Sequence, residues 1–248
     1  MMLHILGFLT VVILVYLGMQ YYVAFWLIRS FPGLPVAPAV VRAVVLGLAL
    51  LFPLSIYLLR HASPATHSLA TVMYVWTGVL LIWVFWAACG DVLLLAASRL
   101  TPSLRARPFI AWGVLAAVAL SSVYAVWNAG RLPRGKEVEV PLPRLPHSLD
   151  GFTVVQISDL HLGVTVPLER FESIVSLVNG LRPDLIVLTG DLVDPGPAPE
   201  EAIARIGTCL KARHGKLAVL GNHEYYHGLE AALECYKRCG ARIVLRAP

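Results

Sequence analysis

The chain has 248 residues, of which 58% are hydrophobic and only 14% are charged. Soluble domains carry about 25% charged residues, so this composition excludes an ordinary soluble protein and indicates membrane-spanning segments. Residues 1–130 contain six arginines and a single acid, Asp91, whereas residues 131–248 contain 14 basic and 14 acidic residues. The net charge of +5 therefore belongs to the apolar part, and the absence of a basic stripe argues against a nucleic-acid partner.

Residues 1–130 are predicted to form a multi-pass transmembrane anchor of about four helices. The first apolar run covers residues 3–28, which is long enough to cross a bilayer with some tilt. The further runs cover residues 43–59, with Pro53 expected to kink the helix, residues 69–88, with a helical continuation to 98, and residues 109–127. Asp91 lies about one bilayer core beyond residue 69, so it is interpreted either as an interfacial helix end or as a buried polar group with a functional role.

The arginines favour one orientation in the plasma (inner) membrane. Arg29 and Arg42 flank the first loop, and three further arginines lie within residues 99–107. Basic loops tend to stay in the cytoplasm, so both termini and the polar part of the chain are predicted to be extracytoplasmic. The basic residues that follow the last apolar run favour the opposite orientation.

The polar part is predicted to be a linker, residues 131–150, followed by an α/β domain, residues 151–248. The linker includes an alternating run, residues 138–142, that could form an edge strand. The domain alternates between predicted strands and helices, which is typical of a parallel sheet with crossover helices. The predicted strands are 152–158, 185–188, 217–220 and 243–245, and the predicted helices are 168–181, 199–213 and 229–239.

Three short polar clusters follow the first three predicted strands. They are Asp159-Leu160-His161, Gly190-Asp191 and Gly221-Asn222-His223-Glu224, with 32 positions from Asp159 to Asp191 and 31 from Asp191 to Asn222. Each interval is the length of one βαβ unit, and open α/β sheets build their sites at the carboxyl ends of their strands.

The residue types in these clusters are those of a metal site, although each cluster alone has a plainer interpretation. Asp159 and His161 lie on the same side of an extended segment and could hold one metal, but a turn would explain them equally well. A Gly-Asp pair after a strand is ordinary turn chemistry. In the third cluster, the Asn222 amide oxygen can bind a hard cation while His223 transfers a proton.

In this order and spacing, the motifs D-x-H, G-D and G-N-H-[DE] resemble those of the calcineurin-like metallophosphoesterases, especially those of the membrane-anchored bacterial type. The resemblance covers roughly residues 137–248. The resemblance implies that Asp159 and His161 hold a first metal, that Asp191 bridges two metals and that Asn222 binds the second. It also implies that His223 stays off the metals as the catalytic residue that stabilises or protonates the departing oxygen. The cofactors would be two divalent ions, of manganese, iron or zinc. Glu224 and Asp194 could orient ligands or cap the segments that follow them, and His227 could line the cleft or lie on the surface.

The implied activity is that of a hydrolase that cleaves a phosphomonoester, phosphodiester or pyrophosphate bond with a metal-activated water. Anchoring in the lipid bilayer would suit a lipid-linked phosphate as substrate. The family also uses a single histidine and a Gly-His-x-His further downstream, and residues 1–248 contain neither after the third cluster. We therefore expect either a fragment of a longer enzyme, whose sheet lacks its C-terminal half here, or a non-catalytic membrane protein that uses a degenerate half-domain for binding. A transporter with Asp91 on its pathway is a weaker third hypothesis.

Overall fold

The computed structural model describes residues 2–33, 35–59, 64–100, 106–162, 166, 168–192, 208–227 and 229–244. The chain forms two compact units that divide between Arg131 and Leu132. The first is a helical unit, and the second is an α/β unit.

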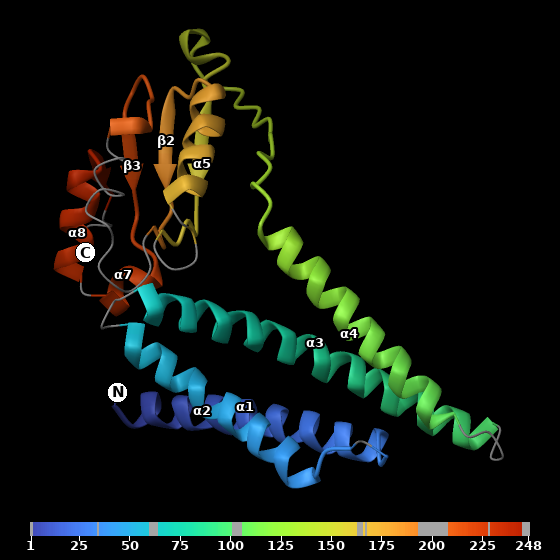
Figure 1. Cartoon of the computed structure of the whole chain (residues 1–248). Coiled ribbons are helices and arrows are strands. Elements are labelled where there is room, and N and C mark those ends of the chain that lie inside the picture. Colours follow the sequence, from blue (N-terminus) through green and yellow to red (C-terminus); the bar gives the residue numbers. More distant parts are fainter. Residues whose placement is uncertain are drawn as a thin grey trace. The chain divides into compact units, whose positions relative to one another are not determined.

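The helical unit confirms the predicted anchor of about four helices (Figure 1). They are α1 (Met2–Ser30), α2 (Pro38–Leu59), α3 (Pro64–Leu100) and α4 (Arg107–Ala129). Among the described residues, three stretches are long and apolar enough to cross a membrane, namely Thr10–Ser30, Ser68–Leu100 and Arg107–Ala129. In α2 the apolar stretch that meets these criteria of composition is shorter, Pro38–Leu51, and Pro53 lies inside the helix.

The helices of this unit pack through small residues and tryptophans. Ala87 and Ala111 are buried in one core with Trp26, and a Cβ added at Gly90 would lie 2.7 Å from Val114 Cγ2. Glycine at this position therefore lets α3 and α4 approach closely, as is common between helices in membranes. The indole of Trp86 donates a hydrogen bond of 3.0 Å to Ser121 Oγ, which adds a polar link between the same two helices.

Asp91 takes a polar role between α1 and α3. Its Oδ2 accepts a hydrogen bond of 2.9 Å from the Tyr22 hydroxyl, and its Oδ1 pairs with the Arg29 guanidinium. The Asp91 side chain is 29% exposed, so it is neither a fully buried charge nor a solvated helix end. The ion pair offsets the cost of placing both charges in an apolar helix bundle.

The α/β unit contains the predicted parallel sheet, with strand order β1-β2-β3-β4. The strands are β1 (Val154–Ile157), β2 (Leu185–Leu188), β3 (Lys216–Ala218) and β4 (Ala241–Ile243), and the helical segments are η1 (His147–Leu149), α5 (Leu168–Gly180), α7 (Asn222–His227) and α8 (Leu229–Arg238). Most of the helix predicted at 199–213 lies outside the described residues. The prediction of an edge strand at 138–142 is wrong, because among the described residues no strand pairs with this exposed segment and its backbone groups have no sheet neighbour.

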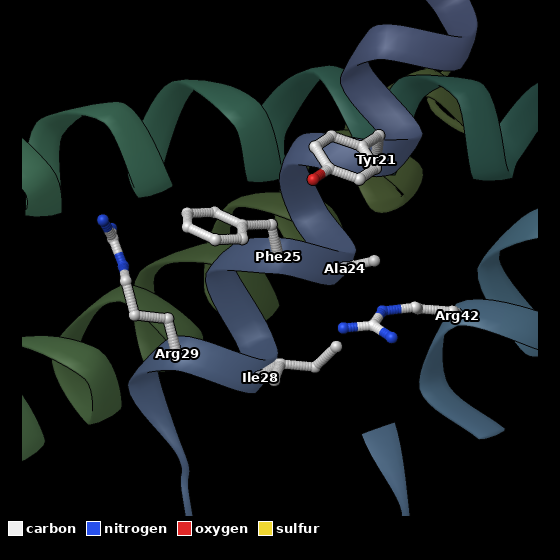
Figure 2. Close-up of a pocket in the computed structure, with 6 residues that line it drawn as sticks. All are labelled: Tyr21, Ala24, Phe25, Ile28, Arg29 and Arg42. Carbon is white, nitrogen blue, oxygen red and sulfur yellow. The ribbon is translucent and has the colours of Figure 1, made fainter. Parts of the chain in front are cut away.

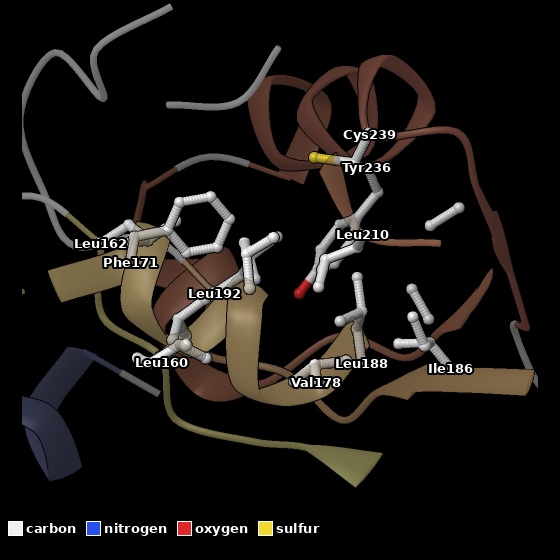
Figure 3. Close-up of a cluster of buried hydrophobic side chains, with 14 residues drawn as sticks. Leu160, Leu162, Phe171, Val178, Ile186, Leu188, Leu192, Leu210, Tyr236 and Cys239 are labelled. Atoms are coloured by element: carbon white, nitrogen blue, oxygen red, sulfur yellow. The ribbon is translucent and has the colours of Figure 1, made fainter. Parts of the chain in front are cut away.

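The core of this unit forms between the sheet and helices α5 and α8 (Figure 3). Phe171, Ile174, Val175 and Val178 are spaced by three, one and three residues along α5, so all four lie on its buried face. Ile186 and Leu188 of β2 are 0% and 1% exposed. Strand β2 is thus anchored in the core up to the residue that precedes the second polar cluster.

Candidate functional site

The loops after β1 and β2 run side by side beyond the ends of their strands. Asp159 N–H donates to Gly190 O at 3.2 Å, His161 N–H to Asp191 O at 3.0 Å and Leu162 N–H to Leu192 O at 3.0 Å. These backbone bonds continue the connection between the two strands past the sheet. They fix the first polar cluster against the second.

Two glycines bring the loop after β3 against the loop after β2. Gly190 has a φ of +94°, and a Cβ at this position would lie 2.5 Å from Gly221 N. A Cβ at Gly221 would overlap the Asp191 carboxylate and lie 2.7 Å from Asp191 N. Gly190 is therefore required by its conformation and by close approach, whereas Gly221 is required by close approach to Asp191.

The Glu224 carboxylate joins these two loops to α8. It is only 4% exposed, and its Oε2 accepts hydrogen bonds from Asp191 N at 3.0 Å and from Gly221 N at 2.8 Å. Its Oε1 accepts from Leu192 N at 2.9 Å and from the Tyr236 hydroxyl at 3.0 Å. Of the two roles considered for Glu224, the structure confirms capping, because the bond to Gly221 N caps the start of α7. Glu224 also holds the backbone at Asp191 and Leu192.

The protonation states of Glu224 and Tyr236 suit this arrangement. Burial alone would raise the pKa of Glu224, but the hydrogen bonds from Leu192, Asp191, Gly221 and Tyr236 outweigh it and lower that pKa. Burial, with the nearby Glu224 charge, raises the pKa of Tyr236. Glu224 is therefore ionised at neutral pH, and Tyr236 remains a hydrogen-bond donor to it.

Three side chains from the three clusters converge on one point. The potential ligand atoms of His161, Asp191 and His223 all lie within 4.8 Å of one another. The imidazole rings of His161 and His223 meet edge to face with their centroids 4.6 Å apart. The backbone N–H of His223 donates a hydrogen bond of 2.9 Å to Asp191 Oδ1. Two imidazoles and one carboxylate are a donor set that zinc, manganese and iron accept, so the residues present fit a divalent metal ion.

The structure places the five predicted site residues differently. His161 and Asp191 belong to the converging group, as does His223, which was predicted to stay off the metals. Asp159 is exposed and accepts a hydrogen bond from the Ser158 hydroxyl, and it is not among the converging residues. Asn222 is an exposed residue at the start of α7.

Two other residues considered from the sequence cannot be placed in the site. Asp194 lies outside the described residues, and so does the side chain of His227. Tyr236, in contrast, was missed by the sequence analysis. It belongs to no motif, and its only signal was its place on the apolar face of the predicted helix 229–239.

The backbone conformation also singles out this region. Among the described residues, four that are not glycine have a positive φ, and three of them are Asp159 at 54°, His161 at 47° and Asp191 at 53°. Such conformations are rare for L-residues and persist where the surrounding structure holds them. Here the backbone bonds between the loops after β1 and β2 hold them.

Comparison with known proteins agrees with this geometry. Residues 152–243 match the family model described as calcineurin-like phosphoesterase. The chain is 38% identical over 152 residues to a zebrafish (Danio rerio) protein named "Transmembrane protein with metallophosphoesterase domain". The matched stretch covers 60% of this chain and 35% of that protein. It is 41% identical over 127 residues to the Bos taurus protein of the same name, covering 51% of this chain and 28% of that protein. It is also 34% identical over 120 residues to "Uncharacterized metallophosphoesterase YkuE" of Bacillus subtilis, covering 46% of this chain and 42% of that protein.

These matches span well under half the length of each of these relatives. The relatives come from animals and bacteria, so they do not single out the bacterial type. No solved structure matches the chain. The zebrafish match includes more of this chain than the α/β unit contains, so the similarity extends into the part that precedes this unit. The chain thus combines helices that are long and apolar enough to cross a membrane with a segment, residues 152–243, that is similar to the calcineurin-like phosphoesterases.

Proposed function

We propose that this chain belongs to a membrane-anchored, metal-dependent hydrolase that cleaves a phosphomonoester, phosphodiester or pyrophosphate bond. The observation that carries this proposal is the convergence of His161, Asp191 and His223 within 4.8 Å at the carboxyl ends of parallel strands.

In this proposal the metals are two divalent ions, of manganese, iron or zinc. Asp159 and His161 would hold the first, Asp191 would be shared, and Asn222 would hold the second. When bound, such a pair supplies a nucleophilic water at neutral pH and neutralises charge on the phosphoryl oxygens. The Asp191 carboxylate suits the shared position because Glu224 and the loop after β1 hold its backbone on both sides.

His223 is proposed to donate a proton to the departing oxygen. Its backbone N–H is bound to Asp191 Oδ1, which fixes the start of α7 beside the metal ligands. Its ring packs edge to face against that of His161. An imidazole beside the metal ligands can serve as a general acid for a leaving group.

The substrate is proposed to be a lipid-linked phosphate at the extracytoplasmic face of the plasma (inner) membrane. The candidate spans support a site that works near a lipid surface, and the arginines near the first and third loops support the orientation. A lipid-linked substrate would remain in the same bilayer as the anchor.

The test is the variant Asp191→Asn in the full chain, purified in a neutral detergent. Metal content is measured by mass spectrometry, and hydrolysis is measured with p-nitrophenyl phosphate and bis(p-nitrophenyl) phosphate. We expect Asp191→Asn to lose bound metal and any hydrolysis. The matched control, Asp150→Asn, changes an exposed acid of the same unit outside the site and should keep both.

Full metal-dependent hydrolysis by Asp191→Asn would refute the proposed site. A wild-type chain that binds metal without hydrolysing either substrate would instead favour the binding half-domain. The exposed position of Asp159, outside the converging group, is the observation that favours this alternative.

A further inference from the structure

Arg42 is a charged residue of the apolar helix α2 for which residues 1–130 provide no counter-ion. Residues 1–130 contain one acid, Asp91, and this carboxylate is already bound by Arg29 and Tyr22. In the part of the chain that the structure describes, the Arg42 side chain takes part in no hydrogen bond or ion pair. Its positive charge is therefore unpaired there.

The Arg42 side chain borders a cavity between α2 and α1. The cavity has a volume of about 140 Å³ and is lined by Arg42 together with residues of α1, which are Tyr21, Ala24, Phe25, Ile28 and Arg29. Figure 2 shows the Arg42 guanidinium reaching toward the part of α1 that carries Ala24 and Ile28, with Arg29 on the other side of Phe25. The cavity thus combines one unpaired cation with apolar and aromatic walls.

Arg29 differs from Arg42 although both line the cavity. Its guanidinium pairs with Asp91 and lies 5.2 Å from the centre of the Phe25 ring, so its charge is already stabilised. Arg42 is exposed on the surface of the helical unit and has neither type of partner among the described residues. A guanidinium in an apolar helix environment is costly unless an anion accompanies it.

Arg42 lies near the amino end of α2, and the candidate span of α1, Thr10–Ser30, ends just before the connection to α2. α1 ends at Ser30 and α2 begins at Pro38, so in a bilayer that α1 crosses, this short connection would lie near the lipid headgroups. Arg42 is the fifth residue of α2, about 6 Å along the helix axis from its start. The amino end of a helix carries a partial positive charge, which disfavours a lone cation and favours an anion beside it.

We propose that this cavity binds the phosphate of an anionic phospholipid, with the phosphate against Arg42. A guanidinium matches two phosphate oxygens with parallel hydrogen bonds. The glycerol and the first part of an acyl chain would pack along Tyr21, Phe25 and Ile28. These apolar walls distinguish a lipid from a free phosphate ion, which would gain nothing from them. This inference does not depend on the proposed hydrolysis.

The test compares the full chain with Arg42→Gln and Arg107→Gln in a neutral detergent. Arg107 is a matched control because it, too, is an exposed arginine near the start of an apolar helix, α4, and does not line the cavity. Phosphatidylglycerol or phosphatidylcholine is titrated, and bound lipid is counted by native mass spectrometry. We expect wild type and Arg107→Gln to bind phosphatidylglycerol more tightly than phosphatidylcholine. We expect Arg42→Gln to bind phosphatidylglycerol at least about ten-fold more weakly than wild type does.

The proposal is overturned if Arg42→Gln and Arg107→Gln bind phosphatidylglycerol equally well, or if wild type does not prefer it to phosphatidylcholine. Displacement of phosphatidylglycerol by millimolar inorganic phosphate would overturn the assignment to a lipid. If Arg42→Gln fails to fold, Arg42→Lys replaces it, because lysine keeps the charge but cannot form paired bonds to phosphate. Wild-type affinity in Arg42→Lys would then contradict the proposed guanidinium contact.

Discussion

Replacing Glu224 by glutamine tests whether one buried carboxylate holds the candidate site together. The carboxylate receives four hydrogen bonds, two on each oxygen, from Asp191, Leu192, Gly221 and Tyr236. Glutamine has nearly the same shape, but only one of its two terminal atoms can accept. The change therefore removes acceptor capacity and charge without creating a cavity.

The expected cost follows from the two orientations of the new amide. If its nitrogen replaces Oε2, it faces the N–H groups of both Asp191 and Gly221. If it replaces Oε1, the Tyr236 hydroxyl can turn to accept, and only the Leu192 N–H loses its acceptor. The second orientation is cheaper. One unsatisfied buried donor and the weaker neutral bonds together amount to about 2–4 kcal/mol.

Hydrogen exchange at the backbone of these loops is the direct assay. If the free energy of local opening falls by about 2–4 kcal/mol, amide exchange becomes roughly 30- to 700-fold faster wherever local opening controls the exchange rate. We expect this in peptides that contain Asp191 and Leu192 and in those that contain Gly221. The matched control is Glu234→Gln, which changes an exposed acid of α8 and should exchange like wild type.

Exchange rates for Glu224→Gln within about threefold of wild type at both loops would refute this reasoning, because such a change is under about 1 kcal/mol. Equal acceleration in Glu224→Gln and Glu234→Gln would refute it as well, since the effect would then not depend on the bonds to the two loops.

Three further predictions concern single contacts. Tyr236→Phe removes the hydroxyl that donates to Glu224 and should destabilise the α/β unit by about 1–2 kcal/mol, measured as faster amide exchange in β2. An unchanged exchange rate would contradict the role of the hydroxyl. Gly190→Ala places a Cβ 2.5 Å from Gly221 N at a residue whose φ is +94°, so we expect the variant to lose bound metal and the exchange protection of both loops. Wild-type metal content in this variant would show that the loops can separate at little cost. Asp91→Asn breaks the ion pair with Arg29, and because both side chains are partly exposed, we expect the helical unit to lose about 1–2 kcal/mol of stability. The loss is detected as a lower melting midpoint of tryptophan fluorescence, because all tryptophans lie within residues 1–130.

The strands and the three polar clusters could be predicted from the sequence because their signals are local. Apolar runs that end in Gly, Asp or Asn marked the ends of β1, β2 and β3, and β2 has the predicted bounds, Leu185–Leu188. The long apolar runs likewise predicted the helices of the anchor. The same reasoning failed for residues 138–142, because alternation shows that a segment suits a sheet but not that a partner strand lies beside it.

Only the tertiary structure decided which polar groups meet. Asp191 and Glu224 are 33 residues apart, and Arg29 and Asp91 are 62 apart, so neither contact has a periodicity that a sequence could display. The place of His223 beside His161, and of Asp159 outside the group, depends on backbone turns with positive φ that hydrogen bonds between loops hold. Local patterns determine which residues reach the end of a strand, whereas the packing of the loops determines which of their side chains face one another.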